Sequence, residues 1–139
     1  MENTSDFQTD LEYGQFAEKL FNGYAINGSF EFKRDRRMHS SGNLFIEWES
    51  RGRPSGISME HVQPVWVYYT DDCSFALMMD ASRLRQALKR YKKECEDGLH
   101  EAPYTWDKQG GDNNTSRGVL IKATELVRIM LELANESAK

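Results

Sequence analysis

Two stretches of the sequence alternate apolar and charged residues with the period of a β-strand, and carboxylates recur at the charged positions. In the first stretch, Glu31, Lys33 and Asp35 share one face, with neighbouring side chains ~6.5–7 Å apart. In the second, Glu47 and Glu49 share a face. Carboxylates that converge on one point repel each other unless a cation lies between them. Mg²⁺ suits such oxygen ligands and keeps several waters, and a neighbouring lysine can orient or deprotonate one of these waters.

These side chains must be positioned by two strands, which the alternation predicts over residues 29–37 and 43–50, with a loop at 38–42 between them. If the two strands pair as a hairpin, both rows of side chains can lie on one face of the sheet. The pattern alone leaves two interpretations open, because alternating charges on an exposed strand face produce the same row without any metal.

The charge distribution around the two rows favours a phosphate-binding surface. The chain carries a net charge of −4, which argues against coating nucleic acid by charge alone. Residues 33–53, however, hold six basic side chains against three acidic ones. Residues 51–56 form a basic turn whose glycines would let the backbone approach a ligand, and an ordinary exposed hairpin loop is the alternative. The residues expected to contact DNA phosphates are Arg34, Arg36, Arg37, Arg51, Arg53 and Ser55.

The remaining patterns predict the elements that surround the two strands. They are helices over residues 8–21, 81–95 and from 124 onward, buried strands over 65–69 and 74–79, and a short strand over 119–122. Residues 96–117 are rich in turn formers and are expected to form a long loop. This order predicts an α/β fold in one domain over residues 1–139, with a mixed β-sheet flanked by helices and a frayed start at 1–6.

Composition predicts a cytoplasmic protein without a membrane span. No apolar run approaches the ~18 residues of a transmembrane helix, and the polar N-terminus lacks a signal-peptide pattern. Cys73 and Cys95 are too few for a disulfide framework, which fits reduced thiols. The three histidines, His39, His61 and His100, lack the spacing of a zinc pair, so each is expected on the surface or in a loop.

Four blocks of the sequence together resemble the PD-(D/E)XK nuclease superfamily. The blocks are Phe30-Glu-Phe-Lys-Arg-Asp, Ser41-Gly-Asn-Leu-Phe-Ile-Glu, Gly52-Arg-Pro-Ser-Gly-Ile and Trp66-Val-Tyr-Tyr, and the later Gly111-Asp-Asn-Asn with Gly118-Val-Leu-Ile is similar too. The resemblance covers roughly residues 10–126 and is closest to the small phage-type group related to Holliday junction resolvases and RecB-like nuclease domains.

The resemblance implies a restriction-endonuclease-like fold and a Mg²⁺- or Mn²⁺-dependent endonuclease that hydrolyses phosphodiester bonds in DNA. The implied enzyme is a phage-type one that selects DNA by its structure and works in the host cytoplasm. Matched residue by residue, Glu31 and Lys33 take the E-x-K positions, and Glu18 takes the carboxylate of the preceding helix. Asp35 and Glu47 take the acidic positions that follow E-x-K in this group. A chain of this size has little surface for gripping two strands, so a homodimer with two sites is also expected.

The chain departs from the family pattern at one position, because the metal-binding Asp usually found about a dozen residues before E-x-K is missing. In one interpretation, Glu18, Glu31 and Lys33 form the site, and Asp35 or Glu47 supplies the missing charge. In the other, Asp35 is the leading Asp and Glu47-Trp-Glu is a variant in which glutamate replaces the lysine. The candidate metal ligands across both are Glu31, Asp35, Glu47 and Glu49. A third interpretation is a nuclease fold without catalysis that binds DNA or a protein partner.

Overall fold

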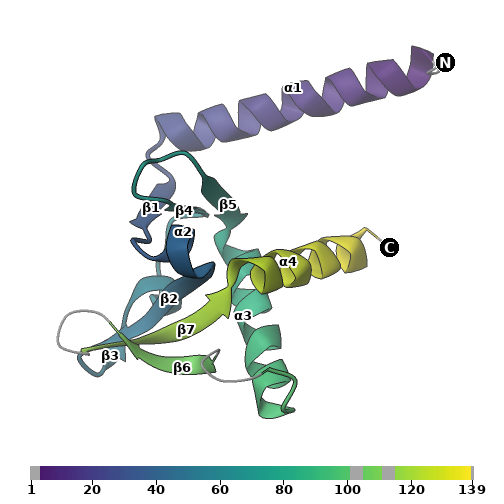
Figure 1. Cartoon of the computed structure of the whole chain (residues 1–139). Coiled ribbons are helices and arrows are strands. Elements are labelled where there is room, and N and C mark those ends of the chain that lie inside the picture. Colours follow the sequence, from purple (N-terminus) through teal and green to yellow (C-terminus); the bar gives the residue numbers. More distant parts are fainter. Residues whose placement is uncertain (1–3, 101–104, 111–114, 139) are drawn as a thin grey trace. The chain divides into compact units, whose positions relative to one another are not determined.

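Helix α1 (Thr4–Ile26) makes up most of Met1–Phe30, the first of two compact units into which the chain divides. The computed structural model describes residues 4–100, 105–110 and 115–138 (Figure 1). The helix is longer than the predicted 8–21, and residues 4–6 of the expected frayed start are helical, whereas 1–3 lie outside the described residues. The predicted apolar stripe of Leu11, Phe16 and Leu20 is exposed at 45%, 66% and 41%.

The second unit, Glu31–Lys139, is built on two sheets flanked by helices. The three-stranded sheet has the order β1 (Phe30–Arg34), β4 (Val65–Tyr69), β5 (Ala76–Asp80), and the four-stranded sheet has the order β3 (Arg53–Pro54), β2 (Asn43–Ser50), β7 (Ser116–Lys122), β6 (Thr105–Gly110). The Asp35 N–H, just beyond β1, donates to the Tyr69 carbonyl at the end of β4 over 3.0 Å. These two strands therefore run parallel, whereas β4 and β5 are antiparallel. The predicted α/β class with mixed pairing and flanking helices is confirmed.

The expected hairpin between residues 29–37 and 43–50 is wrong, because β1 and β2 belong to different sheets. Between them, the predicted loop contains a short helix, α2 (Met38–Ser41), whose Met38 side chain is buried. Gly42 ends this helix in the left-handed region, with φ of 73°, and its carbonyl accepts from the Ala123 N–H over 2.8 Å. Burying Met38 and turning at Gly42 send the chain to a new partner strand, β7.

The core lies between one face of the four-stranded sheet and two long helices, α3 (Ala81–Glu96) and α4 (Ala123–Ser137) (Figure 1). The fully buried apolar side chains that meet there are Leu44, Ile46, Leu84, Ile121, Leu126 and Ile129. Each such side chain stabilises the fold by about 1.5–3 kcal/mol relative to leaving it exposed. The apolar stripes that predicted the two helices therefore face the core. None of the helices in the described parts of the chain has both the length and the apolarity needed to cross a membrane.

Two predictions about strands are wrong, because burial and strand formation in these segments depend on which strands pair with each other. The segment 74–79 was expected to be buried on both faces, but β5 is an edge strand beside β4 among the strands that the structure describes, and Phe75 and Met78 are exposed. Residues 96–117 were expected to form a loop, but β6 pairs with β7 within that range. The motif residues 111–114 lie outside the described residues. The central strand β4 is buried as predicted.

We expect Gly118→Ala to destabilise the second unit by about 1–3 kcal/mol, as overpacking of a dense core does. A Cβ at this position would lie 2.5 Å from the Ile46 carbonyl oxygen and 2.8 Å from the Phe45 ring, and the backbone oxygen cannot move away cheaply. Urea denaturation measures the free energy of unfolding. The control Gly14→Ala adds a methyl group with nothing within 4 Å in α1 and should leave stability equal or higher. Equal unfolding midpoints for Gly118→Ala and wild type would contradict the packing described.

Candidate functional site

The Glu47 carboxylate is held by two hydroxyl groups on the face of the four-stranded sheet opposite α3 and α4. The Ser55 hydroxyl donates to one carboxylate oxygen over 2.7 Å, and the Ser116 hydroxyl donates to the other over 2.5 Å. Ser116 is buried on β7, whereas Ser55 follows β3. Each carboxylate oxygen has a second lone pair, so the orientation is fixed while capacity for another ligand remains.

The turn after β3 lies directly against Glu47, and glycine is required there. Gly56 has φ of 56°, and a Cβ on it would overlap the Glu47 carbonyl oxygen. Gly56 begins the short 3₁₀ helix η1 (Gly56–Ser58), at whose start Ser55 and Ser58 form a reciprocal capping box. The sequence predicted a close backbone approach to a ligand in this turn; the structure shows a close approach to the backbone of the candidate site residue.

The row on β1 is arranged as the alternation predicts. Glu31, Lys33 and Asp35 are half-buried, whereas Phe32 and Arg34 between them are exposed. The Lys33 ammonium lies 3.1 Å from a Glu31 carboxylate oxygen. It also lies 5.4 Å from the centroid of the Trp66 ring on β4, which is a cation–π distance. Lys33 therefore lies on the same face of the three-stranded sheet as Trp66 and gives the row its own positive charge.

The Asp35 side chain joins the end of β1 to the edge of β2. One carboxylate oxygen accepts the Arg37 N–H over 3.1 Å, and the other accepts the Phe45 N–H over 3.2 Å. Because Phe45 is two residues before Glu47 on β2, this tie brings the β1 row towards the Glu47 carboxylate. Asp35 thus has a structural role, because it links β1 to β2.

One cavity of about 540 Å³ brings the two strands' functional groups together. Its lining residues are Glu31, Lys33, Glu47, Ser55, Gly56, Met59, His61, Val62, Gln63 and Trp66. Beside them, burial and the negative charges of Asp35, Glu47 and Glu31 raise the pKa of the Tyr68 phenol far above its ordinary value. Three carboxylates from two sheets are therefore near one buried phenol. Sequence reasoning missed Tyr68, which lies in a plain apolar run, as well as His61 and Ser116.

Glu49 is separated from this cavity by a β-bulge. Glu47 pairs with Gly118 and Glu49 pairs with Arg117, so the register shifts by one residue at Trp48. Gly118 and Arg117 are consecutive and point to opposite faces, so the expectation that Glu47 and Glu49 share a face is wrong. A Glu49 carboxylate oxygen instead lies 3.8 Å from Nε of the Arg117 guanidinium.

The arginines predicted to contact DNA are exposed, and their surroundings differ. Nε of Arg34 lies 3.3 Å from an Asp71 carboxylate oxygen. Arg51 and Gly52 form a two-residue hairpin turn between β2 and β3, with φ of 52° and 77°. Among these predicted arginines, four form no ion pair with any residue that the structure describes: Arg36, Arg37, Arg51 and Arg53. The other predicted carboxylate, Glu18, is exposed on α1 in the first unit.

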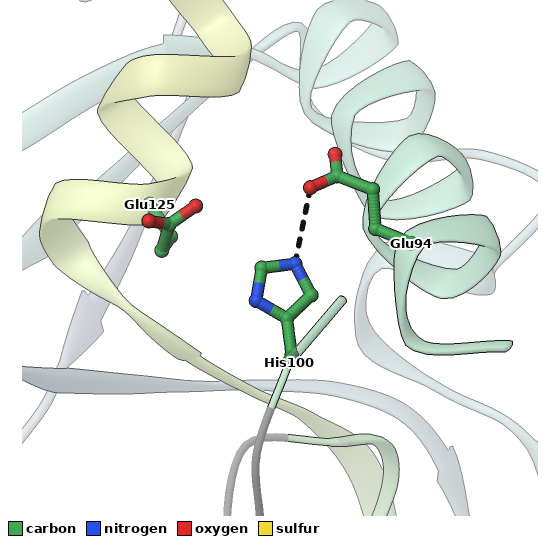
Figure 2. Close-up of side chains that lie close together, drawn as sticks. All are labelled: Glu94, His100 and Glu125. Carbon is green, nitrogen blue, oxygen red and sulfur yellow. Dashed lines mark hydrogen bonds and ion pairs between the residues drawn. The ribbon is translucent and has the colours of Figure 1, made fainter. Parts of the chain in front are cut away.

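A second group of potential metal ligands, Glu94, His100 and Glu125, lies between α3 and α4 (Figure 2). His100 lies in the loop after α3, one of the two expected placements, and is half-buried; its Nε2 lies 3.0 Å from a Glu94 oxygen and its ring packs on Tyr91. Arg128 already supplies a cation, because it donates to Glu94 over 2.5 Å and to Glu125 over 2.8 Å. Desolvation lowers the pKa of Arg128, but hydrogen bonds to these glutamates outweigh it and raise that pKa. This group is therefore an ion-pair network that joins the two helices.

Comparison with known proteins yields no match to a family model, to a curated protein or to a solved structure.

We expect Tyr68→Phe to reduce the loss of stability at alkaline pH. The pKa of Tyr68 is raised in the folded state, so above pH ~10 the unfolded chain loses its phenolic proton while the folded protein keeps it. The stabilisation is complete below the unfolded pKa and is lost above it, by at most about 1.4 kcal/mol per pH unit. Urea denaturation at pH 8 to 11, a range chosen to span the pKa of an ordinary tyrosine, measures this slope. The control Tyr13→Phe removes a 71% exposed phenol on α1. Equal slopes for Tyr68→Phe and wild type would contradict the buried position among carboxylates.

Proposed function

We propose that this protein is a metal-dependent DNA endonuclease of the PD-(D/E)XK type, with its active site in the cavity lined by Glu31, Lys33 and Glu47. One observation carries the proposal. Two carboxylates and a lysine from strands of different sheets line one cavity, although the sequence separates Glu31 from Glu47 by a helix and a turn. A third carboxylate, that of Asp35, follows β1 directly and accepts a hydrogen bond from the Phe45 N–H on β2.

The donor set fits a hard divalent cation. Glu31 and Glu47 offer carboxylate oxygens to the cavity, and those of Glu47 keep lone pairs beyond the hydroxyl groups that orient them. Oxygen ligands without sulfur or a histidine pair favour Mg²⁺ or Mn²⁺ over zinc. Glu31 and Glu47, with Asp35 beside them, would hold the ion. The chemistry it supplies when bound is polarisation of a phosphoryl oxygen and acidification of a bound water.

Lys33 supplies the positive charge of the protein itself. Its ammonium is half-buried between Glu31 and the Trp66 ring, so its position is fixed before a substrate arrives. In this place it donates a charge-assisted hydrogen bond to a phosphate oxygen or orients the attacking water. Ser55 and Ser116 hold the Glu47 carboxylate in one orientation, so that it needs no rearrangement when the ligand binds.

The exposed arginines supply phosphate contacts outside the cavity. Arg51 and Arg53 lie at the β2–β3 hairpin, close in sequence to Ser55 at the cavity, and Arg36 and Arg37 follow Asp35. Because the whole chain is acidic, attraction to DNA is local and should weaken steeply with added salt. A two-fold dimer would present two such sites to two strands.

A second candidate is a binding module without catalysis. It is favoured by the ion pair between Lys33 and Glu31, since a neutralised carboxylate has less need of a metal. This module would bind DNA with the same salt dependence and would be indifferent to Mg²⁺ or Mn²⁺.

We expect the purified protein to cleave DNA when Mg²⁺ or Mn²⁺ is present and to lose this activity in EDTA. Plasmid, branched and single-stranded DNA should be compared, because the site does not specify which of them is preferred. Glu47→Gln and Glu31→Gln each remove a ligand charge and should lower the cleavage rate by about 100-fold or more. Lys33→Ala should also lower it strongly, since it removes the donor to the phosphate.

The matched control is Glu96→Gln, which removes an exposed carboxylate at the end of α3 and should leave cleavage unchanged. Calorimetric titration with Mn²⁺ should show binding to wild type and to the control, and weakened binding to Glu47→Gln. No cleavage of any substrate, together with equal Mn²⁺ binding by wild type and Glu47→Gln, would refute the nuclease. Salt-dependent DNA binding that ignores metal would then support the binding module.

A further inference from the structure

We propose that a second cavity, next to the carboxylate cavity, binds an unpaired nucleobase of the same DNA strand. The inference rests on the proposed function and adds the class of substrate, namely DNA with an unpaired or extruded base. This base cavity measures about 610 Å³, within the range of small-molecule sites. Its lining residues are Trp48, Ile57, Ser58, Met59, Glu60, Arg85, Leu88, Lys89, Lys92 and Val119.

The base cavity combines an apolar wall with a basic rim. Trp48 contributes an aromatic ring, and Ile57, Leu88 and Val119 contribute aliphatic surface. Arg85 makes one wall rigid, because its guanidinium donates to the Ile57 carbonyl over 2.8 Å and to the Met59 carbonyl over 2.7 Å. The rim consists of Lys89, which is exposed, and Lys92, one turn later on the same face of α3.

The two cavities share a wall and are lined by consecutive residues. Glu47 lines the carboxylate cavity and Trp48 lines the base cavity. On the other side, Ser55 and Gly56 line the first, Ile57 and Ser58 line the second, and Met59 lines both. The β-bulge at Trp48 coincides with the boundary between the two cavities, because the side chains of Glu47 and Trp48 point to opposite sides of β2. The two cavities therefore adjoin at Met59 on opposite faces of β2, so a DNA strand that occupies both passes over the segment 55–59.

A nucleobase fits this chemistry better than other ligands. A flat ring stacks on tryptophan and fills an apolar slot, while its phosphates need the lysines at the rim. Paired bases in a duplex are stacked and cannot enter a side cavity, so the occupant must be single-stranded or extruded. An apolar peptide would use the wall, but it would leave Lys89 and Lys92 without an anionic partner from the ligand.

Binding of oligonucleotides in EDTA tests the base cavity without cleavage. The probes are a fluorescein-labelled oligothymidylate of about 12 nucleotides and an abasic strand with the same number of phosphates. We expect the oligothymidylate to bind at least about fivefold more tightly, which corresponds to stacking of a single base. It should also quench tryptophan fluorescence, and Trp48→Phe should remove this quenching while leaving Trp66 and Trp106 in place.

Variants that remove equal charge distinguish phosphate binding by the lysines at the rim of the base cavity from nonspecific electrostatic attraction to DNA. Lys89→Ser combined with Lys92→Ser should weaken oligothymidylate binding about tenfold or more. The control Lys93→Ser combined with Lys108→Ser removes the same charge from exposed lysines that do not line the cavity, and it should have a clearly smaller effect. Equal binding of the two probes, no binding of either, or quenching that persists in Trp48→Phe would overturn the base cavity.

The proposed catalysis and the base cavity can fail independently. Glu47→Gln should keep the preference for the oligothymidylate and the tryptophan quenching, because Trp48 and the lysines are unchanged. Base-dependent binding without metal-dependent cleavage would refute the nuclease and retain the base cavity. Cleavage by wild type with no preference between thymidylate and abasic strands would retain the nuclease and refute the base cavity.

Discussion

The mutual repulsion of three carboxylates is the constraint that the rest of the structure must satisfy. The negative charges of Asp35, Glu47 and Glu31 all raise the pKa of the same buried phenol, Tyr68, so the three carboxylates lie near one another. Each is stabilised by a different kind of partner. Lys33 neutralises Glu31, two backbone N–H groups bind Asp35, and two serine hydroxyl groups bind Glu47. Because these partners come from separate strands and turns, the site forms only when both sheets are in place.

Neighbouring carboxylates have a different role between α3 and α4. Glu94 and Glu125 also approach each other, but Arg128 lies between them and donates to both. A guanidinium is always charged and makes several directed hydrogen bonds, so these carboxylates are satisfied within the protein. In the cavity, by contrast, the Glu47 oxygens are oriented by neutral hydroxyl groups, which leave its negative charge uncompensated. Charge compensation by an arginine, or its absence, distinguishes a structural acidic cluster from a candidate binding site.

A single extra residue on β2 decides which side chains share a cavity. Without the bulge at Trp48, Glu47 and Glu49 would lie on one face, as strand alternation requires. With it, Glu47 lies beside Ser55 and Ser116, Trp48 lines the neighbouring cavity, and Glu49 approaches Arg117. Gly56 supports this arrangement, because only a residue without a Cβ can lie against the Glu47 backbone.

The sequence by itself determined the helices, strands and turns that depend on interactions between residues close together in the chain. The alternation of β1, the apolar stripes of α3 and α4, the buried run of β4 and the Arg51-Gly52 turn were all predictable, since each depends on neighbours a few residues away. Tertiary structure alone decided that β1 pairs with β4 and not β2, and that the polar segment 105–110 forms a strand on β7. It also brought Ser116 to Glu47 and moved Glu49 to the opposite face. These outcomes depend on hydrogen bonds and packing between residues far apart in the chain, which no short window of sequence contains.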